Sequence, residues 1–234
     1  SAGLQYIHSG GTGTVSTMNG GSQVISGGGT GTVSSLNGGG EQYIYSGGTG
    51  TISAMSAGIQ YISGGGAGTV STLNAGNIHI LSGAIGTVSA MNAGNLHIYD
   101  GGTGTVSTMS GGLQNVSSGG AVTLGVMNGG YQTLAGGTGT ISTMSSGTQT
   151  VSSGGTGIIG TFINGRQNVT EGSGTISTMS GGTQNIYSGA TGTVSAMRYG
   201  GIQNVRNGGT GTISTMSAGL QYIHSGGTGT VSTM

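Results

Sequence analysis

Apolar residues recur along this chain with one long period. A segment of the form Thr-Gly-Thr-Val-Ser-Thr-Met, first seen at residues 12–18, returns with small changes from one end to the other. These copies end at Met18, Leu36, Met55, Leu73, Met91, Met109, Met127, Met144, Phe162, Met179, Met197, Met216 and Met234. The steps are 17, 18 or 19 residues, so the 234 residues divide into thirteen units of about 18. Such a fixed period is typical of repeat architectures.

Three positions of the unit are apolar in every copy. One is the Met position, and the other two begin with Ile7 and Val15. Low overall hydrophobicity favours disorder, but a disordered Gly/Ser/Thr polymer has no physical reason to keep apolar residues in phase. The pattern therefore predicts stacked core ladders. Their members include Ile7, Val15, Met18, Ile25, Val33, Ile44, Ile52, Met55, Met91, Met109 and Met216.

The length of the unit decides the fold class. Eighteen residues are too few for a helical repeat or a propeller blade, which need about 33 or more. Val, Ile, Thr and Tyr favour strands, and glycine pairs such as Gly10-Gly11 and Gly20-Gly21 separate the apolar segments as tight corners do. A left-handed triangular helix needs an aliphatic residue every six positions, whereas Gly13 follows Ile7 at that spacing. We therefore predict an all-β, single-chain parallel β-solenoid (β-helix) of thirteen turns with no helices.

Strand alternation assigns a second inward position. Gln5 shares a face with Ile7, and the Gln position is replaced only by Ile78 and Leu96, in two adjacent units. Because an aliphatic residue can take its place, we expect this position to face inward. Stacked amides can then bond from turn to turn, as in Asn/Gln ladders. Members of this predicted ladder include Gln5, Gln23, Gln42, Gln60, Gln114 and Gln203.

The second strand of each unit carries an outward Thr-x-Thr pair. The candidate outward ladder includes Thr12, Thr14, Thr30, Thr32, Thr103, Thr105, Thr210 and Thr212. Flat Thr ladders resemble the ice-binding face of some solenoid antifreeze proteins, although gaps at residues such as Ala67 and Ile85 interrupt this one. Thr is also simply a good residue for an exposed strand. Met18 breaks parity with Val15, which predicts a bend near Ser16-Thr17.

Composition removes several classes of protein. The chain has 59 Gly, no Pro and no Cys, with three Arg or Lys against three Asp or Glu. Collagen is excluded because it needs Gly at every third residue. Nucleic-acid binding needs clustered Lys and Arg, and no apolar stretch is long enough to predict membrane insertion. The zero formal net charge leaves little repulsion between copies, which favours self-association.

Candidate chemistry is sparse. Glu41, Asp100 and Glu171 fall in different units, so no acid/base pair is expected. His79 and His97 occupy the same position of adjacent units, about 5 Å apart at strand spacing. Two imidazoles make a weak metal site, and stacked surface histidines are the better interpretation. The sequence therefore predicts no enzyme, no cofactor and no metal.

The first and last units are identical. Residues 1–18 repeat at 217–234, an offset of 216 residues, while other pairs of units differ at several positions. We expect residues 1–234 to form one continuous solenoid array that is a segment of a longer repetitive protein. A recent duplication of one turn within a complete protein is the alternative.

The first half of the unit resembles a known family. Residues 181–189 (Gly-Gly-Thr-Gln-Asn-Ile-Tyr-Ser-Gly) and 147–156 are similar to the strand-loop-strand repeat of AIDA-type bacterial autotransporter passengers. The resemblance covers essentially the whole chain; the regular second half and the lack of a translocator depart from the family. It implies an extracellular or cell-surface β-solenoid used for adhesion, for self-association or as a stalk. In some relatives, sugars modify Ser and Thr.

These observations together predict a function without catalysis. We expect an extracellular structural fibre or adhesin stalk on a bacterial cell surface that self-associates into filaments or side by side. Expected partners are other copies, a host or neighbouring cell surface, and glycans on Ser/Thr. Ice binding through the Thr ladder is the alternative.

Overall fold

The regular elements are all strands. The computed structural model describes residues 3–234, and within that range it contains no helix. The first twelve strands are β1 (Leu4–Ile7), β2 (Thr12–Ile25), β3 (Thr30–Ile44), β4 (Thr49–Met55), β5 (Ile59–Ile62), β6 (Ala67–Leu73), β7 (Asn77–Ile80), β8 (Ile85–Met91), β9 (Asn95–Ile98), β10 (Thr103–Met109), β11 (Leu113–Ser117) and β12 (Ala121–Met127). The others are β13 (Tyr131–Ala135), β14 (Thr138–Met144), β15 (Thr148–Ser152), β16 (Gly155–Phe162), β17 (Arg166–Val169), β18 (Gly172–Met179), β19 (Thr183–Ile186), β20 (Thr191–Met197), β21 (Ile202–Val205), β22 (Thr210–Met216), β23 (Leu220–Ile223) and β24 (Thr228–Thr233).

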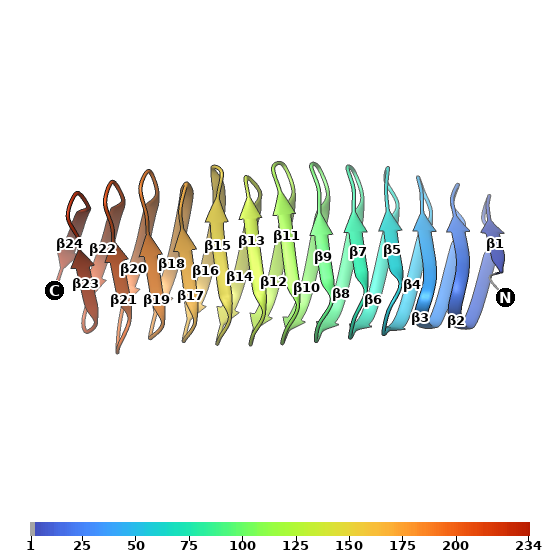
Figure 1. The fold of residues 1–234 in the computed structure, drawn as a ribbon, viewed down its shortest axis with the longest axis horizontal. Helices are drawn as coiled ribbons and strands as arrows, with labels where there is room; N and C mark the ends of the chain where they lie inside the picture. The colour runs from blue at the N-terminus through green and yellow to red at the C-terminus, as the bar shows by residue number, and fades with distance from the viewer. Residues whose placement is uncertain (1–2) are drawn as a thin grey trace. The chain divides into compact units, whose positions relative to one another are not determined.

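The chain divides into two compact units. The N-terminal unit comprises Ser1–Asn115 with Gly119–Val122, and the C-terminal unit comprises Val116–Ser118 with Thr123–Met234. In both units each strand pairs in parallel with the equivalent strand of the next turn (Figure 1). In the N-terminal unit His79 lies opposite His97, and in the C-terminal unit Gln184 lies opposite Gln203. The predicted fold is confirmed: the chain is an all-β parallel β-solenoid of about thirteen turns, with about 18 residues per turn.

Each turn has two glycine corners. In the first turn, Gly10 has φ 76° in a tight turn closed by the Gly11 N–H donating to the His8 carbonyl at 2.9 Å. Gly21, at the second corner, has φ 82°. A side chain at Gly21 would also collide with the Gly3 carbonyl of the adjacent turn. Glycine is required here because the left-handed backbone and the close approach of the neighbouring turn both exclude a Cβ atom.

The second strand bends where the sequence predicts it. Pairing of β2 with β3 joins Val15 to Val33 and then Thr17 to Ser35, so Ser16 takes no part in the ladder. Ser16 is exposed, and Met18 beyond it is buried. The bend turns Met18 back toward the interior, where its side chain is buried.

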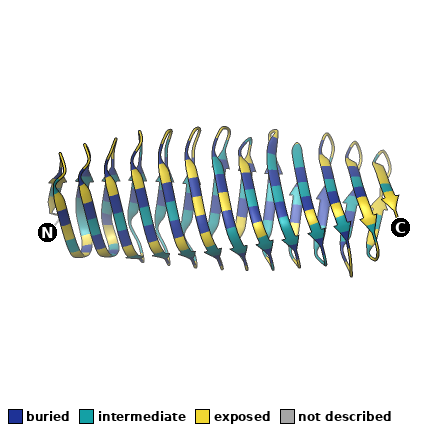
Figure 2. Ribbon diagram, turned by 180° about the vertical axis from the view of Figure 1, so that it is seen from behind, coloured by how far each residue is buried: buried dark blue, intermediate teal, exposed yellow. Residues whose placement is uncertain are grey.

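Buried and more exposed positions alternate along the two strands of most turns (Figure 2). The aliphatic, Met and Gln positions are buried in most turns, with exposed fractions of 0% for Ile25, Val33 and Met55. Three expected inward residues depart from this: Val15, Met216 and Gln5 are only half-buried. They lie in the outermost turns of the structure, where fewer neighbouring turns cover a side chain.

Candidate functional surfaces

The buried glutamines form hydrogen-bonded ladders inside each unit. In every described pair the amide Nε2 of the later turn donates to Oε1 of the earlier one. In the N-terminal unit, Gln23 bonds to Gln5 at 2.8 Å, Gln42 to Gln23 at 2.8 Å, and Gln60 to Gln42 at 2.7 Å. In the C-terminal unit the series runs from Gln132 through Gln149, Gln167, Gln184 and Gln203 to Gln221, at 2.6–2.7 Å. A buried amide is tolerated here because its partner is supplied by the next repeat.

A glycine column opposite the ladder makes room for it. The inward Gly of each Thr-Gly-Thr segment is buried except Gly229 in the last turn, and a Cβ atom on Gly31 would lie 2.6 Å from Gln23 Oε1. The same holds for Gly50 with Gln42 Oε1 at 2.7 Å and for Gly174 with Gln167 Oε1 at 2.8 Å. Several Gln side chains also donate to the carbonyl of such a glycine, as Gln184 does to Gly174 at 3.1 Å. From the sequence, glycine was predicted only as a corner residue, and this inward role was missed.

The outward Thr residues form two parallel rows. Thr12, Thr30 and Thr103 are exposed and belong to the first row, which Ala67 and Ile85 interrupt. The second row is continuous over the described pairs of the N-terminal unit, at Thr14, Thr32, Thr51, Thr69, Thr87 and Thr105. In the C-terminal unit Thr210 is exposed and Thr212 half-buried, while Ser173 and Ile158 break the rows. Exposed hydroxyls therefore line this strand in both units.

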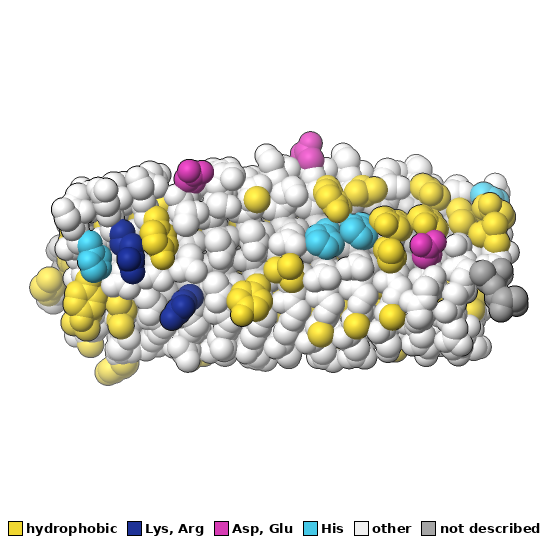
Figure 3. All heavy atoms as spheres, in the orientation of Figure 1, with side chains coloured by type: hydrophobic (Ala, Val, Ile, Leu, Met, Phe, Trp, Pro, Cys, Tyr) yellow, Lys and Arg dark blue, Asp and Glu magenta, His cyan; other side chains and the backbone are white. Residues whose placement is uncertain are grey.

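Aromatic rings stack along the outward face of the N-terminal unit. We name Tyr43, Tyr61, His79 and His97 the aromatic row. Its successive ring centroids lie 5.2, 4.7 and 5.0 Å apart, and the planes are within 17° of parallel. The His79–His97 spacing confirms the predicted stack, visible in Figure 3 as two adjoining His side chains beside hydrophobic ones. Parallel pairing with a constant register places these rings one above another.

Hydrogen bonds fix both ends of the aromatic row. The Tyr43 hydroxyl donates to Glu41 Oε2 at 2.9 Å, and this bond, followed by burial, raises the pKa of Tyr43. At the other end, His97 Nδ1 lies 3.4 Å from Asn115 Nδ2. Next to it, His79 Nδ1 and the Tyr99 hydroxyl are 3.0 Å apart. Burial lowers the pKa of His79 and of His97 below the ordinary value of 6.5, and the charge of His97 lowers that of His79 further. Both rings are therefore mostly neutral at pH 7, so the stack carries little charge.

The equivalent face of the C-terminal unit is an amide row instead. Asn185 Nδ2 donates to Asn168 Oδ1 at 2.8 Å, and Asn204 Nδ2 donates to Asn185 Oδ1 at 2.9 Å. We name these three residues the Asn row. The same repeat position thus carries stacked rings in one unit and a polar ladder in the other.

Titratable and metal-ligating side chains are scattered over residues 3–234. In this range no group of three or more His, Cys, Asp or Glu side chains gathers at one place. The stacked pair His79 and His97 supplies two nitrogen ligands at most. No helix within the described residues is long and apolar enough to span a membrane.

The comparisons with known proteins give a structural relative. No protein-family model matches the chain, and no curated protein matches it in sequence. Among solved structures, the chain is similar to the crystal structure of a hyper-glycosylated fragment of TibA, residues 55–350, whose glycosylation is catalysed by TibC. The TM-score is 0.80 at 29% sequence identity, over 97% of this chain and 91% of that one. This likeness supports the resemblance to autotransporter passenger solenoids at the level of repeat and fold.

Proposed function

We propose that this chain is the repeat region of a secreted, non-enzymatic bacterial surface adhesin or fibre whose outward Ser and Thr carry sugars. The observation that carries this proposal is the in-register rows of exposed hydroxyls, of which Thr30, Thr103 and Thr210 are members. A modifying enzyme that recognises one turn of such a surface would meet equivalent acceptors at every turn. The TibA fragment, with the same fold, is hyper-glycosylated.

Glycosylation is tested by producing the chain with and without TibC. We expect the intact mass to increase by whole sugar residues only when TibC is present, with the sugars on exposed Ser and Thr. A matched control replaces the outward Thr of two neighbouring turns with Val, which keeps the strand propensity but removes the acceptors. An unchanged mass with active enzyme and a folded chain would contradict the glycoprotein part of the proposal.

Self-association is the second part of the proposed function. The formal net charge is zero, so copies repel one another little. We propose that the unmodified protein forms filaments or lateral assemblies, and that sugars reduce this. Electron microscopy and sedimentation of both forms provide the test: monodisperse particles at high concentration without sugars would contradict it.

We also propose that residues 1–216 are one block of a longer array. Residues 217–234 repeat residues 1–18 without a change. A chain with two successive 216-residue blocks should keep the same circular dichroism per residue and melt at an equal or higher temperature, because each added turn is covered by its neighbours. A lower melting temperature for the two-block chain would count against the proposed longer array.

Ice binding is a second candidate, favoured by the continuous row from Thr14 to Thr105. The methyl and hydroxyl groups of this row repeat at strand spacing. Thermal hysteresis and ice shaping by the purified, unglycosylated chain test it. A Thr51→Ser, Thr69→Ser double variant, which removes two methyl groups from the row, should reduce the effect, and no ice shaping at high concentration removes this candidate.

A further inference from the structure

A groove lies on the second glycine corner of the C-terminal unit. It has a volume of about 510 Å³ and spans several successive turns. Its floor includes Gly130, Gly147 and Gly165, which have positive φ angles of 82°, 99° and 110°. Without side chains at these positions, the backbone itself forms the bottom of the groove, so a flat ligand can approach it closely.

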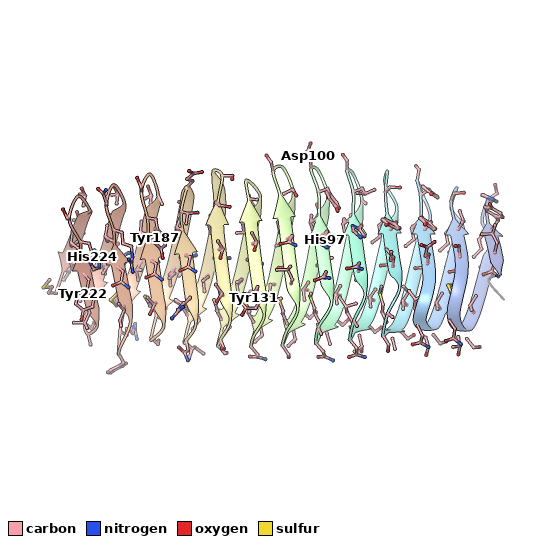
Figure 4. The ribbon with its side chains drawn as sticks, viewed as in Figure 1. His97, Asp100, Tyr131, Tyr187, Tyr222 and His224 are labelled. Carbon is pink, nitrogen blue, oxygen red and sulfur yellow. The ribbon has the colours of Figure 1, made fainter. Side chains whose placement is uncertain are left out.

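An aromatic ring and a guanidinium group stand in one row along this groove. Strand register places Tyr131 opposite Thr148, and Thr148 opposite Arg166. Tyr131 and Arg166 are therefore two strand spacings apart, about 9–10 Å. The Tyr131 side chain is 62% exposed and projects from β13 (Figure 4), and Arg166 is exposed as well.

The rest of the lining is polar and carries no negative charge. Ser146, Thr148, Asn164 and Thr183 supply hydroxyl and amide groups, and no Asp or Glu lines the groove. The Asn164 Oδ1 accepts the Gly165 N–H at 2.8 Å, which orients the amide and leaves its N–H groups as donors. The C-terminal unit also carries three Arg against one Glu, a formal charge of +2. Both the site and its surroundings therefore favour an anion.

We propose that this groove, the Tyr131–Arg166 groove, binds an acidic oligosaccharide. A pyranose ring would stack its C–H face on Tyr131, and the anionic group of a neighbouring sugar would pair with Arg166 in a charge-assisted, bidentate contact. Hydroxyl groups between them would bond to Thr148 and Asn164. The spacing of the two anchors, along a shallow polar floor, suits a linear chain of sugars better than a compact ligand.

This proposal deepens the adhesive function and rests on it, because it names what the surface holds. The contrast within the molecule supports the choice of an anion. At the same corner of the N-terminal unit the groove is smaller, about 270 Å³, and its lining includes Glu41, with Ile59 and Asn77 in register in the two following turns. That groove offers neither an aromatic anchor nor a positive charge.

The test is calorimetric titration of the full chain with an oligogalacturonate, with its methyl ester, and with a sulfated oligosaccharide of similar length. We expect saturable binding of the oligogalacturonate that the methyl ester loses and that added salt weakens. Arg166→Gln should weaken binding about ten- to hundredfold, as loss of a hydrogen-bonded charge pair does, and Tyr131→Ala should weaken it about tenfold. If only the sulfated sugar binds, and Arg166→Gln abolishes this, the anionic class stands and the anion is a sulfate.

Matched controls separate this site from general charge. Arg206→Gln removes the same charge from the same unit, but Arg206 lies over the Tyr187 ring at 5.4 Å and outside the groove. Tyr199 is likewise an exposed tyrosine of this unit that does not line the groove. Arg206→Gln and Tyr199→Ala should leave the affinity within about twofold. Equal losses for Arg206→Gln and Arg166→Gln would overturn the site, as would no binding of either anionic sugar by the folded chain. If the groove variants leave oligosaccharide affinity unchanged while the chain still adheres or self-associates, only this inference is refuted and the proposed function stands.

Discussion

The N-terminal and C-terminal units use the same outward position in opposite ways. In the N-terminal unit it carries Tyr43, Tyr61, His79 and His97, whose rings stack at about 5 Å. In the C-terminal unit it carries Asn168, Asn185 and Asn204, whose amides bond in series. The backbone register is the same in both. Any side chain that interacts well with a copy of itself at strand spacing can therefore be used here, and the surface is free to vary.

The interiors of the two units differ far less. The Gln ladder runs from Gln132 to Gln221 in the C-terminal unit, and from Gln5 to Gln60 in the N-terminal unit, where Ile78 and Leu96 follow. Ile78 and Leu96 are fully buried and lie opposite each other. An apolar pair is acceptable because the two side chains cover one another in adjacent turns. The interior is therefore constrained by its neighbours in a way that the surface is not.

The largest effect is expected from a charge placed in the ladder. Gln184→Glu puts a carboxylate against Gln167 Oε1, where Gln184 Nε2 now donates at 2.7 Å. Burying that charge without a counter-ion should lower the free energy of unfolding by about 3–5 kcal/mol, measured by chemical denaturation. Gln42→Glu should cost as much in the N-terminal unit, because its surroundings are the same.

Two controls sharpen this test. Gln184→Leu, which imitates Ile78, should cost only about 1–3 kcal/mol through the amide partners it leaves behind. Gln221→Glu, at a half-buried position, should cost less than Gln184→Glu. A smaller loss for Gln184→Glu than for Gln184→Leu would show that the ladder is not dry.

An intermediate effect is expected from filling the glycine column. Gly50→Val would place a side chain 2.7 Å or less from Gln42 Oε1 and the Ile44 side chain. Overpacking of this kind should lower the free energy of unfolding by about 1–3 kcal/mol or more. Gly39→Val is the matched control, because nothing lies within 4 Å of its Cβ position, and should change stability by no more than about 0.5 kcal/mol. Equal melting temperatures for the two variants would show that the interior is loosely packed.

The smallest effect is expected on the surface, where the two histidines of the aromatic row can be replaced by Asn, the residue found at this position in the Asn row. The His79→Asn, His97→Asn double variant should be nearly as stable as the parent at about pH 7, within about 1 kcal/mol. The pH dependence of stability should differ more between the parent and the double variant. Folding lowers the pKa of both histidines below 6.5, so the unfolded chain takes up protons first as the pH falls, and stability decreases from about pH 7 to about pH 5.

Thermal melts at the two pH values measure this difference. The melting temperature of the parent should fall more on acidification than that of the double variant. His8 and His224 are present in both proteins, so their contributions cancel in the comparison. An equal fall in the melting temperature of both proteins would contradict the stacking of His79 on His97.

Much of the fold was predictable because the repeat supplies the information many times over. The 18-residue period, the strand residues and the Gly pairs predicted the solenoid, and the parity of Val15 and Met18 predicted the bend at Ser16. The His79–His97 stack followed from the same period. The inward glycine column was missed, since a residue without a side chain gives no hydrophobic signal.

The sequence by itself determined what repeats: the class of fold, the phase of each strand, and which positions lie in one column, because a fixed period stacks equal positions at strand spacing. Only the tertiary structure decided how side chains from different columns meet. The space that Gly50 leaves for Gln42 depends on where a corner brings two columns together, and the groove along the Tyr131–Arg166 column depends on the path of the glycine corners. The contact of His79 with Tyr99 likewise joins two columns of adjacent turns. That geometry is set by the backbone angles of the glycine corners, which the order of residues along the chain does not specify in detail.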